Sequence, residues 1–338
     1  MRVAEWNGPA AEWDAFVGAA ADGTVMHLHG WRRIHQHAYG HPTFLLAATE
    51  DGALRGVLPL TLVRSRLLGA SLVSMPFMDY GGPCVGGFRE AELPLVLAAR
   101  DLALRMSTTL TLRCAREIAA PLPASREKAT LYLDLGRSEE ALWKRLPSER
   151  RNRVRKAQKH GLTASIHGAE ALAEFFTVFA TNMRDLGSPV HSLAFFRAVM
   201  SELGEQTRIV VVRGGGEPIG AGLFLVHGGM ISMPWVSSLR RAFDKCPNPF
   251  LYWEVMRFGV ATGQRVMDFG RSSRDSGGFE AKRQWGAQPV QLHWLHWPEG
   301  SLEAQNAKRL SWGTAWWRRL PVPVANAVGP WLRRGIPN

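Results

Sequence analysis

A repeated pattern constrains the fold of this 338-residue chain more than any other feature. Residues 46–60 have the pattern of a strand, a glycine turn and a second strand, and they lead to Ser-Met-Pro-Phe at 74–77. Residues 210–224 have the same hairpin pattern and lead to Ser-Met-Pro-Trp at 232–235. Because the two copies share both the hairpin and the step that follows it, the sequence predicts a duplicated domain with a ligand cleft where the copies meet.

Composition limits both the class of protein and the kind of partner. With 46% hydrophobic and 21% charged residues, the chain can bury two cores of ordinary domain size. Its net charge of +12 favours an anionic partner, such as a phosphate-bearing substrate, a nucleic acid or an acidic membrane. Neither a secretory signal nor an apolar stretch of about 20 residues is visible. We therefore expect a cytoplasmic protein that is soluble or peripherally associated with the inner face of the membrane.

Neither the cysteines nor the histidines predict a metal site. The three cysteines are far apart and form no Cys-x-x-Cys pair, so we expect neither a disulfide framework nor a structural zinc site. Five histidines fall between residues 27 and 41, but helical side chains at i and i+2, such as those of His35 and His37, face apart. We expect no metal and no tightly bound cofactor.

Helices and strands alternate along the chain, which is typical of an α/β protein. The first lobe is expected at residues 1–137. Its helices are predicted at 12–20, 31–38 and 91–106, its hairpin at 44–63, and its further strands at 109–113 and 129–135.

The second lobe is expected at residues 138–300. Its helices are predicted at 169–186, 193–203 and 249–262, and its strands at 208–213, 219–226 and 264–269. The end of the last strand, Asp-Phe-Gly-Arg at 268–271, is expected to point polar groups into whatever cleft lies beyond the sheet edge.

A basic helix is predicted at the start of the second lobe, over residues 149–160. Ser148 is the expected N-cap and Gly161 the expected stop. Between residues 144 and 159 the chain has eight Lys or Arg residues and one acid, Glu149. Such a helix is either a solvated surface or a phosphate-binding element. We favour phosphate binding because the acids that would balance a merely solvated face are missing.

A basic, tryptophan-rich tail is expected at residues 301–338. It has no acid after Glu303, and its basic and indole side chains are Lys308, Arg309, Arg318, Arg319, Arg333 and Arg334, and Trp312, Trp316, Trp317 and Trp331. Trp beside Arg on short helices is typical of a segment that lies on an anionic membrane. A tail that packs onto the lobes, with Trp in the core, is the equally open alternative.

Three motifs near the end of the second lobe occur in an order that resembles a known family. These are Tyr-Trp-Glu at 252–254, Asp-Phe-Gly-Arg-Ser at 268–272 and, after two glycines, Phe-x-x-Lys-x-x-Trp-Gly at 279–286. Together they resemble the FemAB-like peptidyltransferases of the GNAT acyltransferase superfamily, most of all the branch linked to exosortase (PEP-CTERM) and exopolysaccharide loci. The basic run at 150–157 and Met-Asp-Tyr-Gly-Gly-Pro at 78–83 add to the resemblance, which covers most of residues 20–297.

The resemblance implies a fold and an activity. The fold is α/β (α+β), with tandem GNAT-like lobes, each a mixed, mostly antiparallel sheet flanked by helices, and a central cleft. Family members transfer an aminoacyl group from aminoacyl-tRNA to an amine of a peptidoglycan precursor. The resemblance therefore implies an acyl- or aminoacyltransferase that acts on an amine of a cell-envelope, peptidoglycan or exopolysaccharide precursor.

The acyl donor is left open between aminoacyl-tRNA and an acyl- or acetyl-CoA. The Arg/Gln-x-x-Gly-x-Gly/Ala loop that usually holds the pyrophosphate of acetyl-CoA is missing from its expected place. So is the long coiled-coil insertion that some relatives use to engage tRNA. Two other functions compete with the first: an acetyl-CoA-dependent N-acetyltransferase acting on a small amine or amino sugar, and a non-catalytic module that binds anionic glycolipid or nucleic acid.

The candidate catalytic residues are Lys282, Asp268 and Asp79. Lys282 matches the lysine of the family's Phe-x-x-Lys motif, which the resemblance links to binding a phosphate or stabilising developing charge. Acyl transfer passes through a tetrahedral oxyanion, and a fixed cation such as Lys282 or Arg271 lowers that barrier. An alternative role for Lys282 is a surface pair with Glu280. Asp79 and Asp268 follow predicted strands and are candidate bases for the attacking amine.

The candidate substrate-binding residues fall into polar and aromatic groups. The polar group consists of Arg151, Asn152, Arg153 and Lys156 on the basic helix, and Arg271 and Ser272 after the last strand. The aromatic group, which would form walls for a sugar or an acyl chain, consists of Tyr80, Trp235, Tyr252 and Trp285. Aromatic side chains of this kind also serve simply as core.

Overall fold

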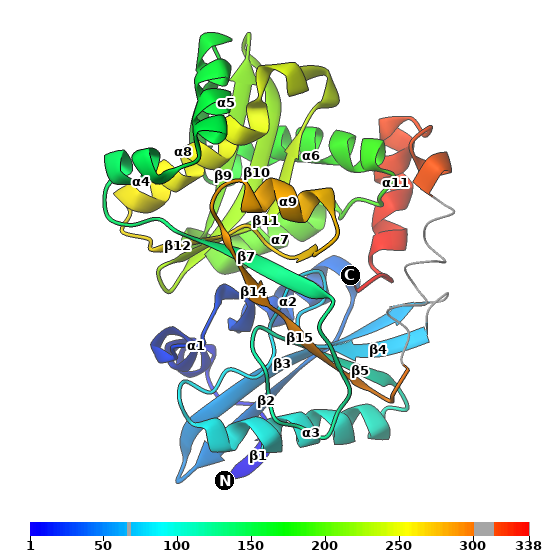
Figure 1. Ribbon diagram of the computed structural model, residues 1–338. Helices are drawn as coiled ribbons and strands as arrows, with labels where there is room; N and C mark the ends of the chain where they lie inside the picture. The colour runs from blue at the N-terminus through cyan, green and yellow to red at the C-terminus, as the bar shows by residue number, and fades with distance from the viewer. Residues whose placement is uncertain (66–68, 301–313, 338) are drawn as a thin grey trace. The chain divides into compact units, whose positions relative to one another are not determined.

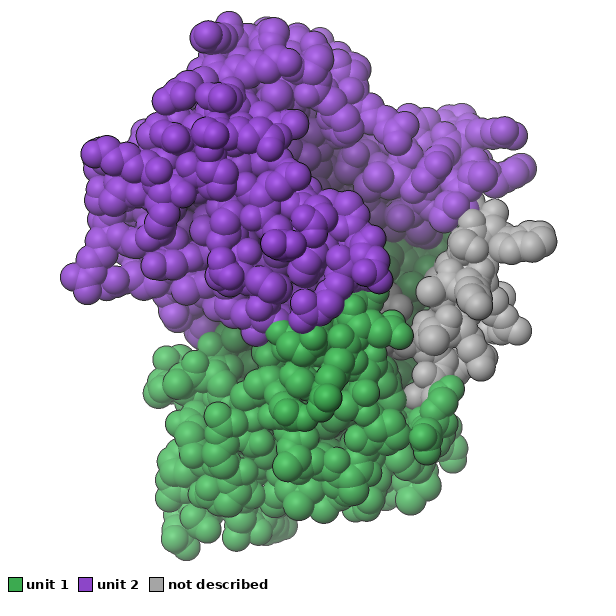
Figure 2. Space-filling model, viewed as in Figure 1, with its two compact units in different colours: residues 1–128, 291–312, 330–338 green, residues 129–290, 313–329 purple. Residues whose placement is uncertain are grey.

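The structure is a computed structural model that describes residues 1–65, 69–300 and 314–337 (Figure 1). It divides into two compact units (Figure 2). The first contains the described residues within 1–128, 291–312 and 330–338, and the second those within 129–290 and 313–329. Each unit has its own sheet and its own hydrophobic core.

The first unit is a seven-stranded sheet with the order β1-β2-β3-β4-β5-β15-β6. Its strands are β1 (Arg2–Glu5), β2 (Thr43–Glu50), β3 (Ala53–Ser65), β4 (Gly69–Val73), β5 (Thr109–Cys114), β6 (Ala124–Ser125) and β15 (His293–Trp297). Its helices are α1 (Ala10–Ala19), α2 (Trp31–Tyr39) and α3 (Glu92–Arg105). The long helix α3 packs on β1, β2, β3 and β5 (Figure 1).

The second unit is an eight-stranded sheet with the order β13-β7-β12-β11-β10-β9-β8, and β14 also pairs with β7. Its strands are β7 (Lys128–Asp134), β8 (Thr163–His167), β9 (Thr207–Gly214), β10 (Glu217–His227), β11 (Met230–Ser238), β12 (Val266–Asp268), β13 (Ser272–Ser273) and β14 (Gln288–Gln291). Its helices are α4 (Glu139–Arg145), α5 (Ser148–Lys159), α6 (Leu172–Leu186), α7 (Leu193–Leu203), α8 (Pro247–Ala261) and α9 (Gly277–Arg283). Near the C-terminus lies a further helix, α11 (Val322–Arg333).

The two sheets repeat one topology, which confirms the predicted duplication. In each unit an edge strand is followed by two helices, three antiparallel strands and a helix that crosses over to a parallel strand. The helix α3 connects the parallel strands β4 and β5, and α8 connects β11 and β12 in the same way. The repeated hairpins in the sequence are β2–β3 and β9–β10.

Two strands join sheets that the sequence did not indicate. Residues 129–135 were expected in the first lobe, but β7 pairs antiparallel with β12 in the second sheet. Conversely, β15 was expected in the second lobe but pairs with β5 in the first sheet. Alternating apolar residues predict that a segment is a strand but do not specify its partner, because pairing is a non-local property. The compact units therefore begin and end at other residues than 137 and 300.

The Ser-Met-Pro step has a different conformation in each copy. In the second unit residues 232–235 lie within β11, paired with β10 and β12. In the first unit β4 ends at Val73, and Met75 and Phe77 take positive φ values of 57° and 71°. The guanidinium of Arg113, which is fully buried, donates to the carbonyl oxygens of Met75 and Met78 at 3.3 and 2.7 Å. This buried cation stabilises the turn that replaces the strand.

The expected N-cap of the basic helix is wrong by one residue. Helix α5 starts at Ser148, its N-cap is Pro147, and no side chain caps it. Pro147, with a φ of −53°, is the residue before the helix, and Ser148 is the first helical residue.

None of the helices in the described residues is long and apolar enough to span a membrane.

Replacement of Leu131 by Ala in β7 tests the strand assignment. Leu131 is fully buried in the core of the second unit, so its loss is expected to lower the free energy of unfolding by about 2–5 kcal/mol. The matched control is Leu104→Ala on α3, where the side chain is 60% exposed and the expected change is within about 0.5 kcal/mol. Urea unfolding followed by tryptophan fluorescence measures both, and equal effects would contradict the assignment.

Candidate active site in the second unit

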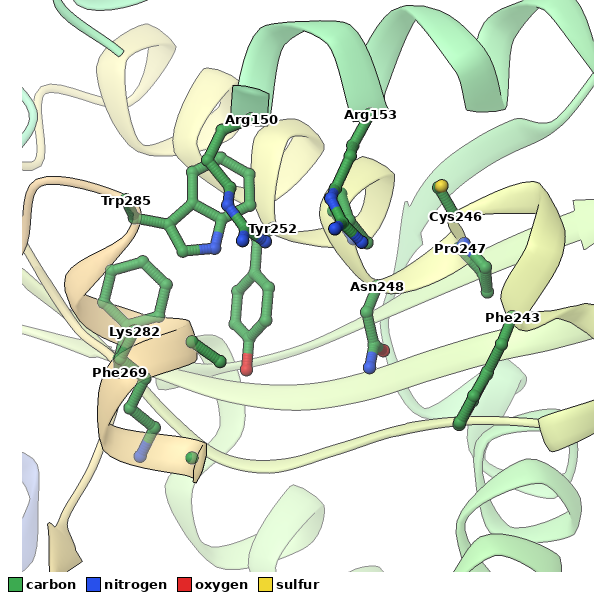
Figure 3. A pocket seen from close by; sticks show the side chains of 13 residues that line it. Arg150, Arg153, Phe243, Cys246, Pro247, Asn248, Tyr252, Phe269, Lys282 and Trp285 are labelled. Carbon is green, nitrogen blue, oxygen red and sulfur yellow. The ribbon is translucent and has the colours of Figure 1, made fainter. Parts of the chain in front are cut away.

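A pocket of about 370 Å³ lies in the second unit, between α5, α8 and α9 (Figure 3). Its polar lining residues are Arg150, Arg153, Asn248, Tyr252 and Lys282, and their side chains come from these three helices. The rest of its lining consists of Phe243, Cys246, Pro247, Pro249, Phe269, Gly278, Ala281 and Trp285. The lining therefore contains three cationic side chains and no carboxylate.

Arg150 is the most buried cation of the pocket, with a relative exposure of 7%. Its guanidinium donates to the side-chain oxygen of Gln284, and its Cζ lies 5.9 Å from the centroid of the Trp285 ring. Its Nε is buried without a hydrogen-bond partner. Burial lowers the pKa of Arg150, because a low-polarity environment disfavours the charged form. The carboxylate of Glu149, with Oε1 3.6 Å from Nη2 of Arg150, offsets part of this cost.

Arg153 lies one turn further along the same face of α5, because residues at i and i+3 are neighbours on a helix. Its Nε and Nη2 both donate to Oε1 of Glu149, at 3.1 and 2.9 Å. These bonds hold the pKa of Glu149 below its usual value. The ion pair orients the Arg153 guanidinium toward the pocket (Figure 3).

The N-terminus of α8 forms another wall. Asn248 accepts a hydrogen bond from the Ser238 hydroxyl through Oδ1, at 2.6 Å, so its amide nitrogen is presented to the pocket (Figure 3). The positive end of the helix dipole adds to the positive potential there. Pro247 and Pro249 have no backbone N–H, however, so side chains supply most of the donors.

An aromatic wall closes the opposite side of the pocket. Tyr252 lies 5.1 Å from Phe269 and 6.0 Å from Trp285, measured between ring centroids. Burial raises the pKa of Tyr252 to about 12. Flat apolar rings beside cations are suited to a flat group that carries phosphate, such as a nucleotide.

Lys282 on α9 is held at the end of β12. Its Nζ donates to the carbonyl oxygens of Gly270 and Arg271, at 2.8 and 3.0 Å. Glu280, the alternative surface partner expected for Lys282, forms an ion pair with Arg283 at 3.3 Å. The structure thus fixes a positive charge at the pocket wall through two backbone carbonyls.

Four of the residues expected from the sequence line this pocket: Arg153, Tyr252, Lys282 and Trp285. Arg151, Asn152 and Lys156, also on α5, do not line it, and neither do Arg271 and Ser272 beyond β12. Spacing alone does not explain the difference on α5, because Lys156 is one turn beyond Arg153 just as Arg153 is one turn beyond Arg150.

The side chains of Trp235 and Asp268 are buried and contact other residues of the fold, not the pocket. Trp235 is 4% exposed, and its ring lies 5.7 and 5.3 Å from those of Phe195 and Phe196, so it is core. Asp268 is 1% exposed, and its Oδ1 accepts from the Thr130 hydroxyl and, at 2.8 Å, from the backbone N–H of Gly270. Its carboxylate holds the turn that follows β12.

Asp79 and Tyr80 lie in the first unit, after the turn that ends β4. Tyr80 is buried, with 1% exposure, whereas Asp79 is partly exposed. Among the histidines of this unit, His35 shares a hydrogen bond of 2.9 Å with Thr61, and burial lowers its pKa to about 3. Within the described part of the chain, no three His, Cys, Asp or Glu residues are arranged to hold a metal.

The sequence interpretation missed two polar residues of the pocket, Arg150 and Asn248. A signal for Arg150 was present in its i, i+3 spacing from Arg153. The signal for Asn248 was its position between Pro247 and Pro249 at a predicted helix start. Because proline has no backbone N–H, a side chain has to supply the hydrogen-bond donor there.

Comparison with known proteins identifies the fold. A family model described as an acetyltransferase (GNAT) domain matches residues 148–283, from α5 to α9. The solved structure of FemX has a TM-score of 0.68 and 14% identity, and the match covers 92% of this chain and 100% of that one. No curated protein sequence matches the chain.

Two further structures have the same architecture. The C-terminal domain of a putative lysylphosphatidylglycerol synthetase from Agrobacterium fabrum has a TM-score of 0.55 and 12% identity, covering 88% of this chain and 95% of that one. A tandem GNAT protein from the clavulanic acid biosynthesis pathway has a TM-score of 0.52 and 15% identity, covering 87% and 97%. The chain has a tandem GNAT-like fold, and the domain match supports the expected acyltransferase class.

The raised pKa of Tyr252 predicts a pH dependence. The unfolded side chain ionises near pH 10, whereas the folded one stays neutral up to about 12. Its contribution to stability is therefore complete below about pH 10 and is lost as the pH rises toward 12. The difference between the ultraviolet tyrosinate titrations of the wild type and Tyr252→Phe isolates this group. A difference centred near pH 10 would contradict the raised pKa of Tyr252.

Proposed function

We propose that the protein is an acyl- or aminoacyltransferase that transfers its acyl group to an amine of a cell-envelope precursor. The observation that carries the proposal is the pocket of α5, α8 and α9, where three cations and an aromatic wall meet without a carboxylate. Within the sequence resemblance, the exosortase-linked branch favours an exopolysaccharide acceptor, and the FemAB-like family as a whole favours a peptidoglycan acceptor. The cytoplasmic face of the envelope is the proposed location.

The pocket is the proposed site for the phosphate-bearing end of the donor. Aminoacyl-tRNA and acyl-CoA both carry an adenosine with phosphate groups, and guanidinium groups bind phosphate through paired hydrogen bonds. A volume of about 370 Å³ is at the lower end of the range for small-ligand sites, which suits one nucleotide unit. No firmly bound cofactor is required.

The start of α8 favours an aminoacyl donor over acetyl-CoA. Backbone N–H groups at a helix start usually hold the pyrophosphate of a nucleotide, but here two of the first three residues are prolines. Phosphate recognition then depends on Arg150, Arg153 and Asn248. The acetyl-CoA-dependent activity is the second candidate, because the matching family model is described as an acetyltransferase domain.

Lys282 is the proposed electrostatic catalyst. The acceptor amine attacks the donor carbonyl, the carbonyl oxygen becomes an oxyanion, and the donor leaves as an alcohol or a thiol. A cation held by two carbonyls needs little rearrangement to stabilise that oxyanion. The proposed bases remain Asp79, which is partly exposed in the first unit, and Asp268, whose carboxylate is engaged in the turn after β12.

Arg153→Ala tests donor binding. Loss of a charged donor is expected to weaken binding of the trinucleotide cytidine-cytidine-adenosine (CCA), which matches the terminus of tRNA, by about 10- to 100-fold. Lys156→Ala, which removes one positive charge from the same helix outside the pocket, should change it less than about twofold. Calorimetry with the trinucleotide and with coenzyme A measures both variants. Equal losses would indicate a general charge effect, and absence of binding to either probe would contradict the proposal.

Lys282→Gln tests catalysis. Glutamine keeps hydrogen-bond donors for the carbonyls of Gly270 and Arg271 but removes the charge, so turnover is expected to fall about 10²- to 10³-fold. The control is Arg283→Gln, on the same helix but outside the pocket. Transfer of a labelled aminoacyl group to an amino-sugar or muramyl-peptide acceptor is the measurement, and thermal melting verifies folding. Unchanged turnover in Lys282→Gln would remove Lys282 from the mechanism.

A further inference from the structure

The described part of the C-terminal tail exposes an unusual amount of apolar surface. Nine large apolar side chains of the described residues are exposed, and four of them fall between residues 316 and 331. Trp316 is 72% exposed, Trp331 51%, Val324 44% and Val328 42%. Lys308, Arg309 and Trp312 lie outside the described residues. Apolar side chains gathered in this way on a surface mark a site of interaction.

Three of these side chains form one stripe on α11. Val324, Val328 and Trp331 are at i, i+4 and i+7, so they share one face of the helix. The small residues Ala325 and Gly329 are buried on a neighbouring face. A Cβ at Gly329 would lie 3.0 Å from the backbone nitrogen of Val190, so this face is in close contact with the chain.

Contacts at both ends of the tail fix the orientation of the stripe. Arg184 donates to the carbonyl oxygen of Leu320 at 2.9 Å. The carbonyl oxygen of Pro337 accepts from the backbone N–H of Phe77 at 2.8 Å and from Arg113 at 3.0 Å. The tail is thus packed, as one of the two sequence interpretations expected, but the packed face is not the one that carries the stripe.

The charge of the tail identifies the kind of partner. After Glu303 the chain has no acid, and Arg318, Arg319 and Arg334 are exposed. Apolar and indole groups beside arginine are suited to the boundary between lipid headgroups and acyl chains. A second copy of this chain is a poorer partner, because the same positive charges would face one another across the interface.

We infer that α11 docks on an anionic lipid surface. Val324, Val328 and Trp331 enter the headgroup region, and the flanking arginines contact lipid phosphates. This docking uses residues outside the pocket and does not depend on the proposed transfer reaction. It would bring the protein to the surface on which envelope precursors are assembled.

Vesicle flotation of the full chain tests the inference. The probes are phosphatidylcholine vesicles with and without one quarter phosphatidylglycerol. We expect flotation with the anionic vesicles and little with the neutral ones. Val328→Ser with Trp331→Ala should weaken partitioning about tenfold. Arg318→Gln with Arg319→Gln should weaken it roughly 30-fold at low salt, about fivefold per charge, and less at high salt.

The matched control replaces two exposed leucines of another helix, α3: Leu93→Ser with Leu104→Ser, which are 41% and 60% exposed. This control should float like the wild type, and circular dichroism verifies that every variant is folded. Failure of the wild type to float, or equal losses in the control, would overturn the inference. The inference would also be overturned if sedimentation showed a dimer of the wild type and a monomer of the Trp331 variant. The stripe would then be covered by a second copy of the chain.

Discussion

The pairing of β7 with β12 is the constraint on which the pocket of the second unit depends. In this antiparallel pair Tyr132 lies opposite Asp268, and the hydroxyl of Thr130 on β7 donates to the Asp268 carboxylate. That carboxylate also accepts from Gly270, which fixes the turn after β12. The carbonyls of the same turn hold Lys282. The strand β7, which precedes the second repeat in the sequence, thus determines the position of the Lys282 side chain on α9.

The two arginines of the pocket share one carboxylate, that of Glu149. Arg150 is almost fully buried, and its guanidinium has three partners: the side-chain oxygen of Gln284, the Trp285 ring and, at 3.6 Å, Oε1 of Glu149. Arg153 is balanced by Glu149, which lies outside the pocket lining. Two cations against one carboxylate leave the arginine side of the pocket with a net positive charge.

Sequence patterns predicted the elements well and the partners of side chains poorly. The basic helix, the two hairpins and the Phe-x-x-Lys motif were all visible, and four expected residues line the pocket. Yet Trp235 and Tyr252, two aromatics with similar expected roles, belong to the core and to the pocket respectively. Whether an aromatic ring faces a core or a cavity depends on which helix covers it, and a local pattern does not contain that information.

By itself, the sequence determined the duplication, the order of helices and strands, the excess of positive charge and the helix that concentrates it. These depend on periodicity and composition over short stretches. Only the tertiary structure decided which sheet β7 and β15 complete, which arginines of α5 face the pocket, and that Asp268 holds a turn. Thr130 and Asp268 are 138 residues apart, and Arg150 and Gln284 are 134 apart. Contacts over such separations arise from the packing of the whole unit, because strand pairing and helix docking bring distant side chains together.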